Sequence, residues 1–389
     1  MKKPPVLIAV LFLLFPLISS PAPAETVKVG VLISPGEGDA ETDASYLRGA
    51  EIAAAEINAS EGRQGTCFLL LIRKVPQAME GKGLRDLFFE EKIQFLIGAV
   101  RYRTVLPVCR AAGEQGIPFL VFPKDFMEAR STGQEPPNLF WISPAPEAFQ
   151  RAAVRTAVQF PGKRIYLLAR DSDAGRNWAR YFWEELFKQK PDAQRAGESF
   201  LPAGVHEYEP YLQTILSAAP EICVSDLGSK EWLSFYRVAR SEGYFKKVIH
   251  VELLAGALEN LSALKKKAPD GIWGVTAFPF WALEEKEARD FVSKYRRNTG
   301  VYPGLSALSG YLSIHALFEG VRKSGGVGRN VAGSLEGLTL ATPLGPIGIR
   351  KNDHRAVWPI WVGSTQYVSD YPFPILGNLK ALGPESFYP

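Results

Sequence analysis

Three residues near position 100 combine charge and aromaticity in a way that could hold a ligand. Arg101, Tyr102 and Arg103 come just after an apolar run and just before an expected helix. Guanidinium groups beside a helix N-terminus hold carboxylates and other anions through charge-assisted hydrogen bonds. Loop arginines also point to solvent or pair with nearby acids, and the sequence leaves both interpretations open.

A second group of such residues follows the next apolar run, residues 117–122. Phe122 ends this run, and Lys124 and Asp125 come just after it. Charges directly beyond a buried strand favour a ligand site more than charges scattered over a surface do. Phe122 and Lys124 are therefore candidate ligand-binding residues.

Acidic residues follow several later apolar runs. Asp171 and Asp173 lie in one turn, Asp226 ends another run, and Glu252 comes after a third. Aspartates in such turns commonly cap the helix that follows, which is the alternative to a ligand contact. From this group, Asp173 and Glu252 are kept as candidate ligand-binding residues.

An aromatic cluster late in the chain, Phe278, Phe280 and Trp281, is the last candidate. An aromatic wall suits an apolar or aromatic ligand. Core packing is the competing account for Phe278, and Trp281 joins the candidate ligand-binding residues.

Signatures of catalysis are missing. No His-Glu-x-x-His pattern, zinc-spaced Cys/His pair, Walker A loop or Gly-x-Gly-x-x-Gly follows any expected strand. Ser306 lacks the glycines of a nucleophile elbow. The histidines stand singly, at positions His206, His250, His315 and His354. We expect no enzyme, no cofactor and no metal site.

The elements that position these residues are apolar runs alternating with helical patterns. The first series has runs at residues 27–33, 68–72, 93–97 and 117–122, with helical patterns at 44–59, 83–91 and 105–113. The second has runs at 165–169, near 199, and at 222–226 and 248–251, with helical patterns at 147–159, 177–189, 208–218 and 230–242. Runs this apolar are typical of parallel strands buried on both faces.

Two such series predict an α/β fold of two doubly wound parallel-sheet lobes. The predicted division places residues 25–143 and 273–336 in lobe 1, 144–272 and 337–365 in lobe 2, and 366–389 in a C-terminal tail. Ligands of open parallel sheets lie beyond the carboxyl ends of the strands, so the expected site is the cleft between the lobes. Hinge closure around a small solute suits this geometry.

The N-terminal residues predict export. Lys2 and Lys3, an apolar run at 6–18 and Ala22-Pro23-Ala24 have the layout of a cleavable secretory signal spanning residues 1–24. No cysteine follows it, so we expect a free periplasmic protein and not a lipoprotein. The net charge of +4 comes from interleaved acids and bases, which gives no indication of a nucleic-acid partner.

Cysteine usage adds little. Cys67, Cys109 and Cys223 are an odd number, so at most one disulfide can form. Two of them lie in or beside apolar runs, where a cysteine acts as a small buried hydrophobe. The sequence predicts no particular bridge.

Stretches along nearly the whole chain resemble the periplasmic leucine/isoleucine/valine-binding and amide-binding receptors of ABC transporters. They include residues 27–31, 47–58, 94–98, 116–120, 171–175, 310–311, 344–347 and 354–357. The resemblance implies a type I periplasmic binding protein fold with a multi-strand hinge, a monomeric receptor, and an ABC permease complex of the inner membrane as partner. It also implies that an acid near Glu252 meets a ligand ammonium group.

The ligand loops depart from that family. Where many members have small hydroxyl residues after Gly98, this chain has Arg101, Tyr102 and Arg103, and Lys124 and Ala174 also replace the usual residue types. We therefore expect a small amino-acid-like, amide or carboxylate ligand rather than an ordinary amino acid. The alternative function is a sensory or accessory binding protein for a sensor kinase or a quinoprotein dehydrogenase system, without transport.

Overall fold

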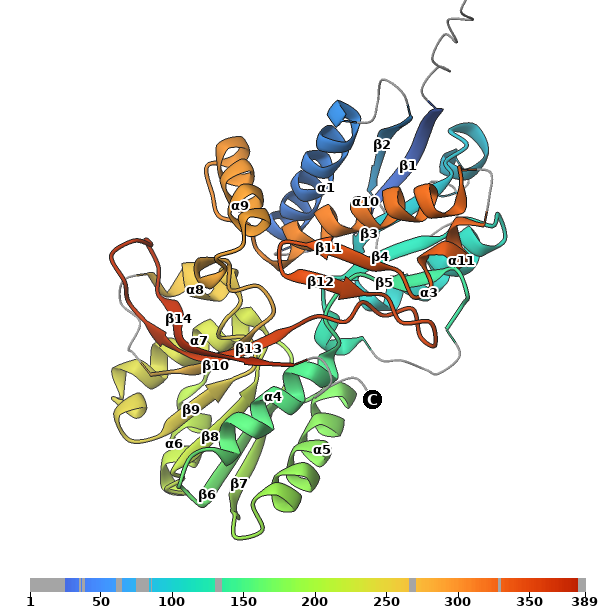
Figure 1. Cartoon of the computed structure of the whole chain (residues 1–389). Helices are drawn as coiled ribbons and strands as arrows, with labels where there is room; N and C mark the ends of the chain where they lie inside the picture. The colour runs from blue at the N-terminus through green and yellow to red at the C-terminus, as the bar shows by residue number, and fades with distance from the viewer. Residues whose placement is uncertain are drawn as a thin grey trace, which may run out of the picture.

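The computed structural model describes residues 25–34, 36, 39–60, 65–74, 84, 86–129, 135–265, 271–327 and 330–383. The expected secretory signal at residues 1–24 lies outside the described residues. Two lobes, each built on its own sheet, lie one above the other in Figure 1. Among the described residues, no helix is long and apolar enough to cross a membrane.

Lobe 1 contains a five-stranded parallel sheet in the order β2-β1-β3-β4-β5. Its strands are β1 (Glu25–Ile33), β2 (Thr66–Lys74), β3 (Phe95–Val100), β4 (Phe119–Pro123) and β5 (Leu139–Trp141). Side chains of β3 and β4 alternate between two apolar clusters, so both faces of the sheet are covered. The covering elements are α1 (Ala40–Ser60) and α10 (Leu305–Ser324) on one face, and α3 (Tyr102–Gly113) and a π-helical turn, η1 (Asp86–Glu90), on the other.

Smaller elements complete lobe 1. They are η2 (Phe126–Glu128), α9 (Lys286–Thr299), α11 (Val331–Leu335) and a hairpin of β11 (Thr339–Thr342) and β12 (Gly345–Gly348). The α9 helix lies along α1, while α11 and β11 pack on α10.

Lobe 2 contains a seven-stranded sheet in the order β14-β13-β10-β9-β8-β6-β7. The strands are β6 (Arg164–Arg170), β7 (Gln194–Leu201), β8 (Ile222–Asp226), β9 (Ile249–Glu252), β10 (Trp273–Thr276), β13 (Ile360–Gln366) and β14 (Ile375–Leu382). The strands β7, β6, β8, β9 and β10 are parallel to one another. The strand β13 is antiparallel to both of its neighbours, β10 and β14. The helices are α4 (Pro146–Val158), α5 (Asp173–Gln189), α6 (Glu209–Ser217), α7 (Ser229–Ser241) and α8 (Leu258–Leu264), with short turns η3 (Tyr244–Lys246) and η5 (Phe280–Ala282).

The predicted strands and helices occur in the predicted order, and the structure adds β5 and α8, which were not predicted. The predicted division into lobes differs from the structure for three segments. The strand at 273–276 pairs with β9 and β13, so it belongs to the sheet of lobe 2 and not to lobe 1. The hairpin at 339–348 packs on α10 in lobe 1. The expected tail contains β14, which pairs with β13. Apolar runs show that a strand is buried, but carry no information about which sheet buries it.

The chain crosses between the lobes at three places. These are the segments joining β5 to α4, β10 to α9, and β12 to β13. Before the last crossing, residues 354–356 pair with β5, because Trp141 donates to the carbonyl of His354 and Ala356 donates to that of Trp141. One apolar cluster runs through the crossings and includes buried side chains from both sheets. Three segments of the chain therefore connect the two lobes.

Two glycines allow the backbones of α1 and α10 to touch. A Cβ atom on Gly310 would lie 2.1 Å from the carbonyl oxygen of Tyr46, and one on Gly49 would lie 1.9 Å from that of Ala307. We expect Gly310→Ala to lower the free energy of unfolding by about 1–3 kcal/mol, because a backbone atom cannot move aside. Urea unfolding measures the loss. Gly320→Ala on the same helix is the control: its Cβ would meet only the side chains of Leu335 and Val331, which can shift, so equal destabilisation by both variants would contradict this account.

Candidate functional site

A pocket of about 150 Å³ lies between the lobes, beyond the carboxyl ends of several strands. Lobe 1 lines it with Thr42, Phe122, Lys124, Phe126 and residues 304–306. Lobe 2 lines it with Phe149, Ser229, residues 254 and 256–259, and residues 275–278. A cavity of this size holds one molecule about as large as benzene.

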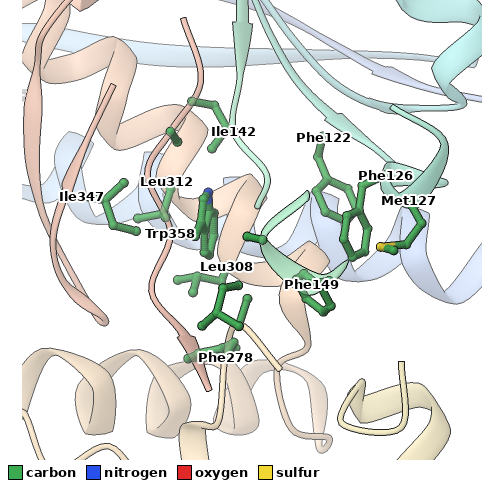
Figure 2. Close-up of a cluster of buried hydrophobic side chains, with 14 of the residues drawn as sticks. Phe122, Phe126, Met127, Ile142, Phe149, Phe278, Leu308, Leu312, Ile347 and Trp358 are labelled. Atoms are coloured by element: carbon green, nitrogen blue, oxygen red, sulfur yellow. The ribbon is translucent and has the colours of Figure 1, made fainter. Parts of the chain in front are cut away.

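Aromatic side chains form much of the wall. Phe126 of lobe 1 meets Phe149 of lobe 2 edge to face, with ring centroids 5.2 Å apart. Phe122 stacks on Tyr46 behind it at 6.3 Å. Figure 2 shows Phe122, Phe126 and Phe149 gathered where the lobes meet, with Phe278 in the same cluster. This wall favours a ligand with a compact apolar body.

Lys124 lines the pocket, yet its ammonium group is already surrounded by oxygen atoms. Its Nζ donates to the Ser34 carbonyl at 2.5 Å and to Asp43 at 2.7 Å, and it lies 3.1 Å from Asp39. The Lys124 side chain is 4% exposed. Burial raises the pKa of Asp43, and the hydrogen bond from Lys124 opposes that rise. The charge of Lys124 is therefore balanced inside lobe 1.

Of the predicted anion-holding residues, Arg101 and Tyr102 have hydrogen-bond partners in lobe 1. Arg101 pairs with Asp39 at 2.9 Å, and its backbone N–H donates to Ser34. Tyr102 begins α3, its backbone N–H donates to Asp125 at 2.6 Å, and its ring packs near Trp141. Arg103 is exposed on α3. None of the three lines the pocket.

Glu252 is fully buried inside lobe 2 and does not line the pocket. It forms a hydrogen-bonded chain in which its Oε2 lies 2.5 Å from Ser225 Oγ, which contacts His250 Nε2 at 2.8 Å, and Tyr244 contacts His250 Nδ1 at 3.0 Å. Burial raises the pKa of Glu252 to about 8 and lowers that of His250 to about 3. Near neutral pH both groups are uncharged.

The two remaining predicted residues stand apart from the pocket. Asp173 is exposed at the first residue of α5, where Ser172 provides the helix cap. Trp281 is half-buried, packs against Phe280 and donates its indole N–H to the carbonyl of Leu376. The structure thus brings Phe122 and Lys124 to the pocket and leaves the other six away from its lining.

One charged link between the lobes was missed by the sequence analysis. Arg170, at the end of β6 in lobe 2, forms an ion pair with Glu128 of η2 in lobe 1. The same guanidinium lies 3.2 Å from the buried Asp226. Arg170 ends its strand as the other candidates do, but Glu128 follows no apolar run. Only the folded chain brings these partners together.

A wider groove of about 1010 Å³ runs along α1, α9 and α10 on lobe 1. It shares no lining residue with the pocket between the lobes and contains none of the predicted site residues. Within the described residues, no group of three His, Cys, Asp or Glu side chains is placed to hold a metal ion, and the cysteines are free thiols. The interlobe pocket is therefore the candidate site.

Comparisons with known proteins agree with this architecture. A solute-binding protein of an ABC transporter from R. palustris, in complex with 4-hydroxybenzoate, is 15% identical, with a TM-score of 0.78 over 92% of this chain and 97% of that one. An ABC transporter substrate-binding protein from Sphaerobacter thermophilus is 18% identical, with a TM-score of 0.78 over 92% of this chain and 98% of that one. An ABC-type branched-chain amino acid transporter protein from Rhodopseudomonas palustris is 18% identical, with a TM-score of 0.74 over 93% of this chain and 98% of that one. At these identities the likeness shows the fold.

The family itself is shown by the sequence. No protein with a curated function matches the chain. The profile described as periplasmic binding protein matches residues 26–370, which cover both lobes and all three crossings. The chain therefore belongs to the periplasmic binding protein family and has its type I fold.

Proposed function

We propose that the protein is a non-enzymatic receptor that captures one small solute between its lobes and delivers it to an ABC permease complex in the inner membrane. The observation that carries this proposal is the composition of the pocket, because both lobes contribute residues to its wall. A solute bound there contacts both lobes and stabilises the closed arrangement relative to an open one. Chemistry on the solute is not required.

Other features support the same proposal. The solved relatives are proteins of ABC transporters, and one of them holds 4-hydroxybenzoate, a ligand with a single ring. Family membership and the expected signal at residues 1–24 favour the periplasm. One chain supplies both walls of the pocket, so a monomer suffices.

A thermal-shift screen tests this function. The solutes are aromatic acids, aromatic and aliphatic amines, amides, urea and branched-chain amino acids. A ligand that binds only the folded state at 100 times its Kd stabilises the protein by about 2.7 kcal/mol, which raises Tm. We expect at least one class to do so, and the same solute to reduce the radius of gyration measured by X-ray scattering. A solute that raises Tm without compaction, or no active solute, would contradict the proposal.

The interlobe ion pair offers a second measurement on the same receptor. Glu128→Gln removes the charge that Arg170 meets across the lobes. We expect this variant to be more open without ligand and to bind the active solute more weakly, because less of it is in the closed state. The control is Glu185→Gln, which removes an ion pair with Lys188 inside α5 and should leave the affinity unchanged.

A sensory or accessory partner would use the same closure with a different docking protein. Neighbouring genes distinguish the two: permease and ATPase genes support transport, while sensor kinase or oxidoreductase genes support the accessory function.

A further inference from the structure

The charge balance of the pocket indicates the chemistry of its ligand. Among the described residues, only two ionisable side chains line it, Lys124 and Glu259. Lys124 is neutralised by Asp39 and Asp43 and contacts a carbonyl oxygen as well. Its ammonium group has no charge left to offer a ligand without losing one of these partners. An anion would have to displace them.

Glu259 is in the opposite situation. It lies in the first turn of α8, half-buried in the wall of lobe 2. Among the described residues, no lysine, arginine or histidine forms an ion pair with it. Burial raises the pKa of the Glu259 carboxyl, and so does the like charge of Glu41. A hydrogen bond from its own backbone N–H lowers the pKa. A partly buried carboxylate without a cation is less stable than one beside a cation, and a ligand cation would supply that partner.

The carboxyl of Glu259 reaches across to lobe 1. A Cβ atom on Gly304 would lie 2.9 Å from Glu259 Oε1, so this oxygen rests against the start of α10. Ser306, two residues further on, also lines the pocket and is 2% exposed, and its Oγ has no hydrogen-bond partner within the part of the chain that the structure describes. The carboxylate of Glu259 and the hydroxyl of Ser306 therefore both line the pocket near the start of α10, and each can accept a hydrogen bond from a ligand donor.

We propose that Glu259 anchors the ligand, and that the ligand is a small monocationic amine with a compact apolar body. This inference rests on the proposed function of the interlobe pocket. The ammonium group lies against Glu259 and Ser306, and the body fills the space beside Phe122, Phe126 and Phe149. A carboxylate in the same place would lie beside the carboxylate of Glu259, while Lys124 is already held by Asp39 and Asp43.

Three probes with one ring and different polar ends test the proposal: benzylamine, benzyl alcohol and benzoate. Their affinities are measured by calorimetry at pH 7.5 on the whole protein. We expect benzylamine to bind most tightly and benzoate least. Glu259→Gln should weaken benzylamine about 10- to 100-fold, the range of a charge-assisted hydrogen bond, and leave benzyl alcohol much less affected. The control Glu287→Gln, on the exposed part of α9, should change none of the three.

The outcomes separate this inference from the proposed function. Benzoate binding more tightly than benzylamine, or benzylamine binding equally to wild type and Glu259→Gln, overturns the assignment of an amine. If benzoate binds with closure of the lobes and benzylamine does not bind, the receptor function stands and the assignment of an amine ligand fails. If Ala257→Trp, which fills the pocket from its edge, leaves benzylamine affinity unchanged, the amine binds elsewhere and the inference fails. If no probe and no screened solute binds the folded wild type, both proposals fail.

Discussion

Replacing Lys124 with Met is expected to destabilise the protein by about 3–5 kcal/mol, the usual cost of leaving a buried charge without its partner. Lys124 is 4% exposed, and its carboxylate neighbours Asp39 and Asp43 are 13% and 8% exposed. Without the ammonium group, the two carboxylates repel each other in a poorly solvated place, and only Arg101 still pairs with Asp39. Urea unfolding followed by tryptophan fluorescence measures the change.

Two further variants make this result specific to charge. Asp43→Asn in the Lys124→Met background removes one of the repelling carboxylates, so it should recover part of the lost stability. Lys163→Met is the control, because Lys163 and Asp192 form an ion pair of similar length, 2.9 Å, in which both side chains are more than half exposed. We expect no measurable change there. Wild-type stability of Lys124→Met, or failure of Asp43→Asn to restore any, would contradict the account.

Lys124 shows which features of the site can be predicted from the sequence and which cannot. Its place just beyond an apolar run predicts that it lies at the end of a buried strand, and it does. The partners of Lys124 come from the start of α1, and no pattern along the chain links positions 39 and 43 to position 124. The period of apolar residues predicts elements, while pairing between distant charges depends on how the elements pack.

The place of Glu259 in the pocket also could not be predicted from local sequence patterns. Glu259 follows no apolar strand, and it lies in the first turn of a seven-residue helix that the sequence did not predict. The pocket reaches it because α8 of lobe 2 lies opposite the start of α10 in lobe 1. Likewise, β10 was assigned to the wrong lobe because its apolar character is equally compatible with either sheet. The fold class is thus predictable from local patterns, and the site is largely determined by contacts between lobes.

The second large expected effect is a dependence of folding stability on pH, and it comes from Glu252. The buried carboxyl titrates near pH 8, whereas the ordinary value for glutamate is 4.5. Between these values the unfolded chain releases a proton that the folded protein keeps, so stability falls as pH rises, by about 1.4 kcal/mol per pH unit. Below pH 4.5 both states hold the proton, and above pH 8 both have lost it, so the slope is confined to this window.

The hydrogen-bonded chain explains how the folded protein tolerates the protonated acid. Ser225 donates to the ionised form of Glu252, and once Glu252 is protonated its own O–H can donate to Ser225 instead. Ser225 then donates to Nε2 of the neutral His250. The charged groups nearest this chain are Asp226, which raises the pKa of Glu252, and Arg170, which is bound to Asp226. Ionising Glu252 places a second carboxylate beside Asp226, with one guanidinium for both.

Glu252→Gln is therefore expected to remove most of this pH dependence. Gln keeps the shape and hydrogen bonds of the protonated acid and cannot ionise, so between pH 5 and pH 8 the wild type should lose up to about 4 kcal/mol relative to the variant. The measurement is urea unfolding of both proteins at half-unit steps of pH, with the exposed Glu287→Gln as the control that retains the wild-type slope. Parallel curves for wild type and Glu252→Gln would show that Glu252 is ionised in the folded protein at neutral pH.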